Sequence, residues 1–100
     1  MNSDYCPDIS MEYVLTIIIP HFNDPDALEE LLETIPNNGK IQIIVIDDNS
    51  TQFTTKFDEL KNRNRHVEFY SNESNNKGAG ACRNLGMRKA CGKWLLFADS

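Results

Sequence analysis

The sequence lacks the features of a membrane-spanning or secreted protein. None of its apolar runs approaches the ~20 residues that a transmembrane helix needs. The opening segment, residues 1–5, is polar and acidic, without the basic start and apolar stretch of a secretory signal. We therefore expect a cytoplasmic protein with no transmembrane segment.

Cysteine is scarce and irregularly spaced. The three cysteines, Cys6, Cys82 and Cys91, form neither an even-numbered framework nor a C-x-x-C pair. This pattern argues against both a zinc site and structural disulfides. We expect reduced thiols.

Positive charge is in the minority, because the formal net charge is −5. That balance argues against a nucleic-acid partner. Acids are nevertheless absent from residues 77–93, a stretch that carries five basic residues. Such a stretch suits an anionic ligand, and it is equally typical of a solvated helix face.

The apolar residues that are present alternate between two spacings. Predominantly apolar runs at 14–19 and 41–46 predict buried strands, the first ended by Pro20, and the shorter runs at 67–70 and 94–98 predict two further strands. Helical spacing over 24–35, 50–60 and 79–90 predicts three helices between them. After a tail at 1–12, residues 13–100 are therefore predicted to form one domain, an α/β, Rossmann-like three-layer αβα fold with a mainly parallel four-stranded sheet.

The helices have recognisable beginnings and one unusually small face. Asp24 is a predicted N-cap before Pro25, and Ser50 is a predicted cap for a helix carrying apolar positions at 53, 57 and 60. The third helix places four small residues on one side. They are Ala79, Cys82, Gly86 and Ala90, and we expect them to allow close packing on the sheet.

Polar clusters follow the predicted strands at their carboxyl ends, where parallel sheets bind ligands. After the first strand, Phe22 offers an aromatic face for a base, and His21 has the features of an exposed loop residue. After the second, Asp47 and Asp48 follow four apolar residues, a costly place for charge without donors or cations. One of these acids can accept from a base or ribose while backbone amides hold the other.

Two further clusters complete the candidate site. The loop 76–80 brings backbone amides to the start of the third helix, and Arg83 lies one turn inside it, so both can meet phosphate oxygens. The spacing of its glycines is not that of the dinucleotide fingerprint G-x-G-x-x-G. After the fourth strand, Asp99 suits a hard divalent cation and a diphosphate.

Four ordered motifs together resemble the family 2 glycosyltransferases. They are TIIIPHFN at 16–23, IVIDDNS at 44–50, NKG at 76–78 with ACRNLG at 81–86, and GKWLLFADS at 92–100. The resemblance implies the A-type glycosyltransferase fold, of which these residues would form the nucleotide-binding half. Members of the family transfer a sugar from a nucleotide-diphosphate donor to an acceptor, mostly with inversion at the anomeric carbon.

The resemblance also implies roles for individual residues. Asp48 would read the base or ribose, with Asp47 as its support, and Asp99 would open an Asp-x-Asp element that touches ribose and Mn²⁺ or Mg²⁺. The donor would be a nucleotide-diphosphate sugar, with a UDP-sugar the expected one. The full set of expected substrate-binding residues is Pro20, His21, Phe22, Asn23, Asp24, Asp47, Asp48, Lys77, Gly78, Arg83, Asp99 and Ser100, with Asp99 as the metal ligand.

The second acid of that element would be residue 101, and the catalytic base and acceptor site would belong to a downstream half. We therefore expect these residues to be part of a longer protein and to be inactive alone. The family resemblance implies polysaccharide or glycoconjugate assembly, with peripheral attachment at the inner face of the membrane. An uncovered sheet edge would favour self-association.

Two other functions fit parts of the sequence. Residues 44–48 also resemble the acidic pocket of phosphoacceptor receiver domains, with Asp99 as the acceptor, but receivers begin with the acidic strand and here another strand and helix precede it. A non-catalytic nucleotide-binding module would use the same donor-side residues and lack the acceptor half.

Overall fold

The computed structural model describes residues 13–99. The predicted tail at residues 1–12, and Ser100, lie outside the described residues. The elements alternate along the chain. In order they are β1 (Leu15–His21), α1 (Pro25–Glu33), β2 (Ile41–Asp47), α2 (Thr54–Arg63), β3 (Glu68–Ser71), α3 (Ala79–Lys89) and β4 (Trp94–Phe97).

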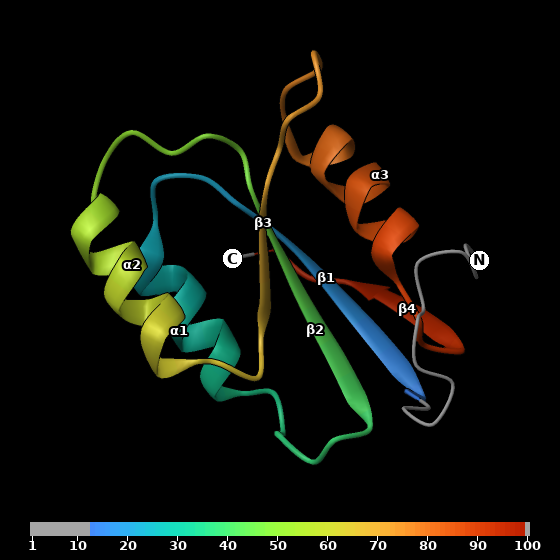
Figure 1. Ribbon diagram of the computed structural model, residues 1–100. Coiled ribbons are helices and arrows are strands. Elements are labelled where there is room, and N and C mark those ends of the chain that lie inside the picture. Colours follow the sequence, from blue (N-terminus) through green and yellow to red (C-terminus); the bar gives the residue numbers. More distant parts are fainter. Residues whose placement is uncertain (1–12, 100) are drawn as a thin grey trace.

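The four strands form one parallel sheet in the order β3-β2-β1-β4. Helices α1 and α2 cover one face, and α3 covers the other (Figure 1). This confirms the three-layer α/β prediction. The order also puts the carboxyl ends of β1 and β2 at the centre of one sheet edge, because these two strands pair along their full length from Leu15↔Ile41 to His21↔Asp47.

The core has two parts because side chains alternate between the faces of a strand. Toward α1 and α2, the buried residues of β1 and β2 pack with those of the helices; they are Ile17, Ile19, Ile43, Val45, Leu28, Leu32, Phe57 and Leu60. Toward α3, Ile44 and Ile46 pack with Cys82. The central strands are buried on both faces, which is why their sequence is predominantly apolar; the buried Thr16 and Gln42 are exceptions and bond each other.

Pro20 does not end β1, contrary to the prediction, since the strand continues to His21. Successive residues of a strand direct their backbone groups to opposite neighbours. Ile18 O accepts from Ala98 N, while His21 O accepts from Asp48 N, so Pro20 faces the β4 side. The pairing with β4 ends at Ile18↔Phe97. A residue without an N–H is therefore tolerated at position 20.

Helix α2 begins later than predicted, and Ser50 does not cap it. Phe53 occupies the N-cap position in a left-handed conformation (φ 59°) and makes no side-chain cap hydrogen bond. Its ring is 60% exposed, so it does not continue the apolar face formed by Phe57 and Leu60. Ser50 instead bonds Asp47 and Asn23, as described below.

Helix α3 lies close to the sheet at a glycine. A β-carbon added at Gly86 would collide with the side chain of Ile18, which is fully buried in the central strand β1. Cys82, Gly86 and Ala90 are buried, as the small-residue pattern predicts. Ala79 is the exception because it is exposed at the start of the helix.

Strand β4 has little cover on either face. Its four residues, Trp94, Leu95, Leu96 and Phe97, are 39–70% exposed. This edge is the uncovered apolar surface expected from the sequence, and self-association through it stays a prediction. Among residues 13–99 no helix has the length and apolar character needed to cross a bilayer.

The expectation of reduced thiols is wrong for Cys91, which is disulfide-bonded. Cys82 is free and buried. Disulfide pairing depends on which cysteines the fold brings together, and an odd count with irregular spacing does not exclude one pair.

Candidate functional site

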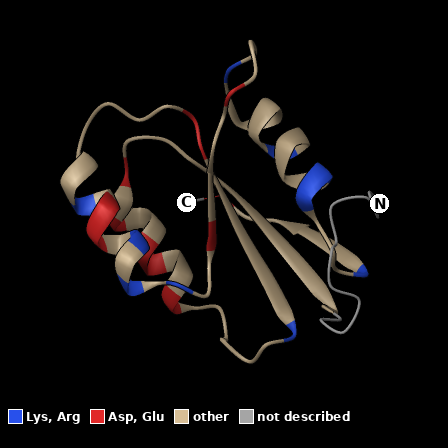
Figure 2. Ribbon diagram, viewed as in Figure 1, with Lys and Arg blue, Asp and Glu red and all other residues tan. Residues whose placement is uncertain are grey.

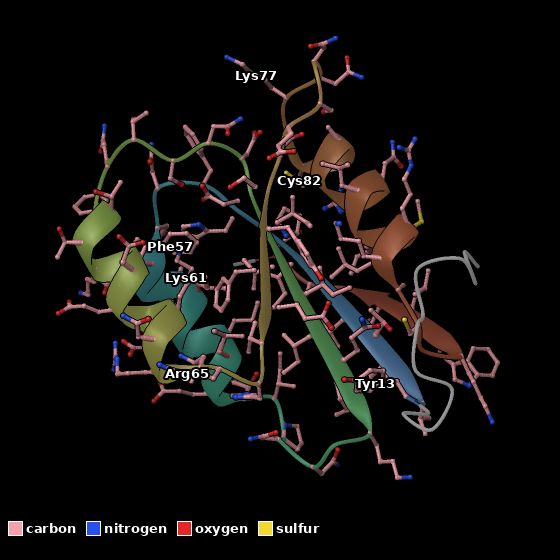
Figure 3. All side chains as sticks on the ribbon, viewed as in Figure 1. Tyr13, Phe57, Lys61, Arg65, Lys77 and Cys82 are labelled. Atoms are coloured by element: carbon pink, nitrogen blue, oxygen red, sulfur yellow. The ribbon has the colours of Figure 1, made fainter. Side chains whose placement is uncertain are left out.

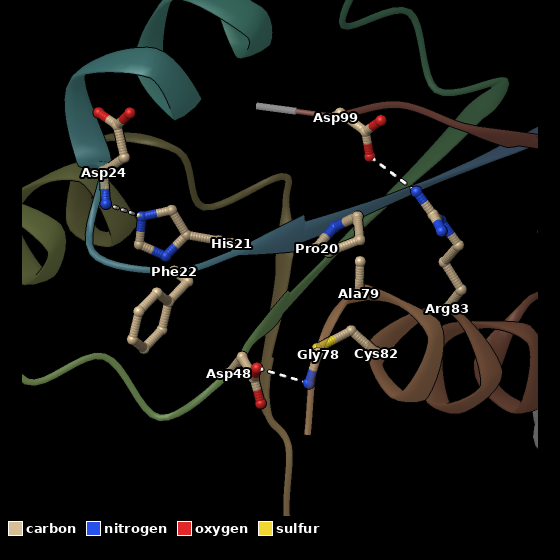
Figure 4. A pocket seen from close by; sticks show the side chains of 10 residues that line it. All are labelled: Pro20, His21, Phe22, Asp24, Asp48, Gly78, Ala79, Cys82, Arg83 and Asp99. Carbon is tan, nitrogen blue, oxygen red and sulfur yellow. Dashed lines mark hydrogen bonds and ion pairs between the residues drawn. The ribbon is translucent and has the colours of Figure 1, made fainter. Parts of the chain in front are cut away.

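A cleft of about 500 Å³ opens at the carboxyl ends of the strands (Figure 4). Most of the residues predicted from the sequence line it. These are Pro20, His21, Phe22, Asp24, Asp48, Gly78, Arg83 and Asp99, and Ala79 and Cys82 complete the lining. Ala79 and Cys82 belong to the small face of α3, whose pattern predicts packing on the sheet but does not reveal that the same face closes a cleft.

The other predicted residues lie elsewhere. Asn23 and Asp47 support the loops that border the cleft, as shown below. Lys77 stands at the tip of the loop before α3 and points away from the molecule (Figure 3). Ser100 lies outside the described residues. The substrate-binding roles of the predicted residues stay predictions.

His21 is buried and takes part in a fixed hydrogen-bond arrangement, which corrects its assignment as an exposed loop residue. It is 2% exposed, and its ring stacks on Phe57 with the centroids 4.6 Å apart. The backbone N–H of Asp24 donates to Nε2 at 3.2 Å. Since Nε2 is the acceptor, Nδ1 carries the proton in the neutral ring and donates to Asp47 Oδ1 at 2.8 Å.

Asp47 connects three segments around the cleft. Oδ1 accepts from His21 and from the Ser50 hydroxyl at 2.6 Å, and Oδ2 accepts from Ser50 N at 3.0 Å. Burial raises the pKa of Asp47, but the hydrogen bonds from His21 and Ser50 prevail and hold the pKa below its ordinary value. With its oxygens occupied by these donors, Asp47 acts as the support for the strand-end loops.

Asp48 is the neighbouring acid that faces the cleft. Its Oδ2 accepts from Gly78 N at 2.8 Å, and its Oδ1 accepts from Asn72 Nδ2 at 2.8 Å. A carboxylate offers about four lone-pair positions. Two such bonds therefore fix its orientation and leave capacity to accept from a ligand.

Arg83 and Asp99 form an ion pair in the lining of the cleft, with Arg83 Nη2 2.9 Å from Asp99 Oδ1. The guanidinium comes from the first turns of α3, a helix with only basic charged side chains (Figure 2). Arg83 Nε is buried without a hydrogen-bond partner. An Arg beside the positive end of a helix is a recognised arrangement for phosphate binding.

Asp99 is a suitable donor in the cleft for the divalent ion expected from the resemblance. Within residues 13–99, no three His, Cys, Asp or Glu side chains lie close enough to hold a metal ion. Asp99 is a hard oxygen ligand at the rim of the cleft, 75% exposed at its side chain. Mg²⁺ is commonly held by one or two carboxylates together with substrate phosphates. Asp99 therefore fits as one ligand of such a site.

Asn23 links the loops that follow β1 and β2. Its backbone is left-handed (φ 52°), and its Oδ1 accepts from Thr51 N at 2.9 Å and Gln52 N at 3.0 Å. The hydroxyl of Ser50 accepts from Asn23 N at 2.8 Å. The loop that carries Phe22, whose ring is 58% exposed, is thereby held against the loop that carries Asp48.

The Cys82 thiol is expected to react slowly with alkylating agents although it lines the cleft. Burial raises its pKa to about 11, with Asp48 and Asp47 adding to the effect. At pH 8 the reactive thiolate is then about one part in a thousand. Mass spectrometry after iodoacetamide treatment should show native Cys82 unmodified while the denatured protein is labelled; equal rates in both states would contradict this.

The parallel sheet and the acid-and-arginine cleft at its carboxyl edge define an α/β ligand-binding domain suited to a phosphorylated ligand. Residues 16–100 match the family described as Glycosyl transferase family 2, and the chain belongs to that family. Membership of this family does not favour the alternative of a phosphoacceptor receiver domain.

Curated relatives and solved structures are glycosyltransferases of greater length. Similarity extends to a poly(ribitol-phosphate) beta-glucosyltransferase of Bacillus spizizenii, 31% identical over 91 residues that cover 86% of this chain and 14% of the relative. It extends also to GalNAc(5)-diNAcBac-PP-undecaprenol beta-1,3-glucosyltransferase of Campylobacter jejuni, 30% identical over 88 residues, 85% of this chain and 28% of the relative. The crystal structure of S. aureus TarS 1-349 in complex with UDP superposes with a TM-score of 0.71 at 28% identity, over 87% of this chain and 27% of that one.

Proposed function

We propose that the cleft binds the nucleotide diphosphate of a sugar donor, with UDP as the nucleotide, as part of an inverting, metal-dependent glycosyltransferase that acts on a glycan or lipid-linked acceptor. The observation that carries this proposal is the placement of Asp48 and Arg83 in one cleft. A carboxylate with free acceptor capacity suits a base or ribose, and a guanidinium at a helix start suits a diphosphate. The resemblance to a TarS structure in complex with UDP supports the choice of nucleotide.

Different residues of the cleft would contact different parts of the donor. The exposed ring of Phe22 gives the base a stacking surface, and Asp48 accepts hydrogen bonds from the nucleoside. The first backbone amides of α3 have no acceptor within the helix, so they can donate to a phosphate bound at its start. Arg83 then leaves its ion pair with Asp99 to meet the phosphate oxygens.

Release of Arg83 frees the Asp99 carboxylate for Mn²⁺ or Mg²⁺. When bound, such an ion neutralises the charge that develops on the leaving diphosphate. The acceptor site and the base that activates the acceptor hydroxyl are proposed to lie beyond residue 100. The 100 residues alone are therefore expected to bind donor without transferring sugar. Action at the cytoplasmic side of a membrane stays a prediction from the sequence.

Calorimetry with UDP, with and without Mn²⁺, tests the proposal. The protein should bind UDP, more tightly with Mn²⁺, and Asp48→Ala should weaken binding by about tenfold because a charge-assisted hydrogen bond is worth about 1.5 kcal/mol. Asp58→Ala removes an exposed acid on α2 that pairs with Lys61, and serves as the control. No heat from the unsubstituted protein, or equal binding by the Asp48 and control variants, would refute the proposal.

A further inference from the structure

Asn72 follows directly after β3 and is 2% exposed, although none of the motifs in the sequence contains it. Its backbone N–H donates to Asp47 O at 2.8 Å, which continues the pairing of β3 with β2 by one residue. Its backbone O accepts from Asn49 Nδ2 at 3.0 Å. The residue is therefore anchored to the β2 loop before its side chain makes any contact.

The Asn72 side chain uses all its hydrogen-bonding positions, on three residues. Nδ2 donates to Asp48 Oδ1 at 2.8 Å and to Asn76 O at 2.9 Å. Oδ1 accepts from Ser74 N at 3.0 Å and from the Ser74 hydroxyl at 2.6 Å. An amide supplies two donors and two acceptor sites, and here each is engaged inside a loop that runs past the cleft.

Both ends of the loop 72–78 therefore bond the Asp48 carboxylate. Asn72 holds Oδ1 from the start of the loop, and Gly78 N holds Oδ2 from its end. A carboxylate held at both oxygens by donors from one loop cannot rotate without breaking a bond at either end. Only a side chain with two donors can bond Asp48 and Asn76 together, and an acid at position 72 would repel Asp48.

We propose that Asn72 is the positioning residue that sets the Asp48 carboxylate for recognition of the nucleoside, an inference that rests on the proposed nucleotide-binding function. Asn72 does not line the cleft itself. Its effect on binding passes through Asp48 and the backbone of the loop, so it depends on the presence of the Asp48 carboxylate.

A double-mutant cycle on UDP affinity tests this dependence. Asn72→Asp, close to Asn in volume, should weaken UDP binding by about tenfold, because it removes a hydrogen bond to a charged group and adds a like charge. In the Asp48→Ala background the same substitution should have less than about a twofold effect. Asp58→Ala removes an exposed acid on α2 that pairs with Lys61, outside this hydrogen-bond network, and should leave affinity unchanged within the same margin. Equal effects of Asn72→Asp in both backgrounds would overturn the proposal.

A second measurement does not require nucleotide. Glycine-selective ¹⁵N labelling reports on the five glycines of the chain, and Asn72→Asp should shift the Gly78 amide signal and speed its hydrogen exchange while the Gly86 signal stays in place. An unchanged Gly78 signal would overturn the positioning role. Absence of UDP binding by the unsubstituted protein would refute the proposed function, and the Gly78 signal would then decide the positioning role alone. Asn72→Ala and Asn72→Ser repeat both measurements if the acidic variant does not fold.

Discussion

Asp47→Ala is expected to destabilise the protein by about 3 kcal/mol, a large share of the stability of a small domain. The substitution leaves three donors without their acceptor, namely His21 Nδ1, the Ser50 hydroxyl and Ser50 N. His21 is 2% exposed, so water cannot replace the lost partner without opening the structure. Urea denaturation followed by circular dichroism measures the loss.

Two variants separate this effect from loss of charge. Asp47→Asn keeps one acceptor oxygen and is expected to lose about 1–2 kcal/mol. Asp58→Ala removes an acid whose side chain is 67% exposed and should leave the denaturation midpoint almost unchanged. A loss in Asp47→Ala no greater than in Asp58→Ala would show that the Asp47 hydrogen bonds contribute no net stability.

The contribution of Asp47 should also depend on pH in a defined direction. Its pKa in the folded protein lies below the ordinary value, so folding favours the charged form. The resulting stability is fully present above the unfolded pKa of about 4 and is lost as pH falls through the folded pKa. Asp47→Asn should therefore flatten the acid side of the stability profile.

The fold was predictable because its central strands are buried on both faces. Residues 14–19 and 41–46 show this as predominantly apolar runs, and parallel pairing then brings the acids after β2 beside the polar loop after β1. Most of the cleft follows from that geometry alone. The loop amides and Arg83 at the start of α3 could also be predicted, whereas the place of Ala79 and Cys82 in the cleft could not.

The internal supports of the site were not predictable in the same way. His21 meets Asp47 only because the register of β1 and β2 places them opposite each other, 26 residues apart in sequence. Register is set by the packing of whole strands and has no local signature. The sequence around His21 is therefore that of an exposed loop residue, although the side chain is buried.

Asn72 illustrates the same limit in a loop. The segment 71–76 consists of polar residues whose composition predicts only a turn. Its order comes from Asp48 and Gly78, which belong to different parts of the chain. Buried side-chain hydrogen bonds between distant segments depend on the final arrangement, so composition and spacing do not reveal them.

Two glycines on the same helix are expected to respond to alanine in opposite directions. Gly86→Ala places a methyl group against Ile18, a stiff β-branched residue fully buried in the central strand β1. Overpacking at such a site costs about 1–3 kcal/mol, which exceeds the gain of up to about 1 kcal/mol from a better helix former. Gly80→Ala has nothing within 4 Å of the added carbon, so only the gain remains.

Because both substitutions are identical and lie in α3, their difference isolates the contact between the helix and the sheet. Thermal denaturation should show a lowered midpoint for Gly86→Ala and an unchanged or raised midpoint for Gly80→Ala. Pairing Gly86→Ala with Ile18→Ala, which removes both γ carbons that the added methyl group would meet, should cost less than the sum of the two single substitutions, since the two residues share one contact. A stabilised Gly86→Ala would mean that α3 moves away from β1 at little cost. The cleft would then also change shape, since α3 carries Arg83 and its first residues lie against Asp48.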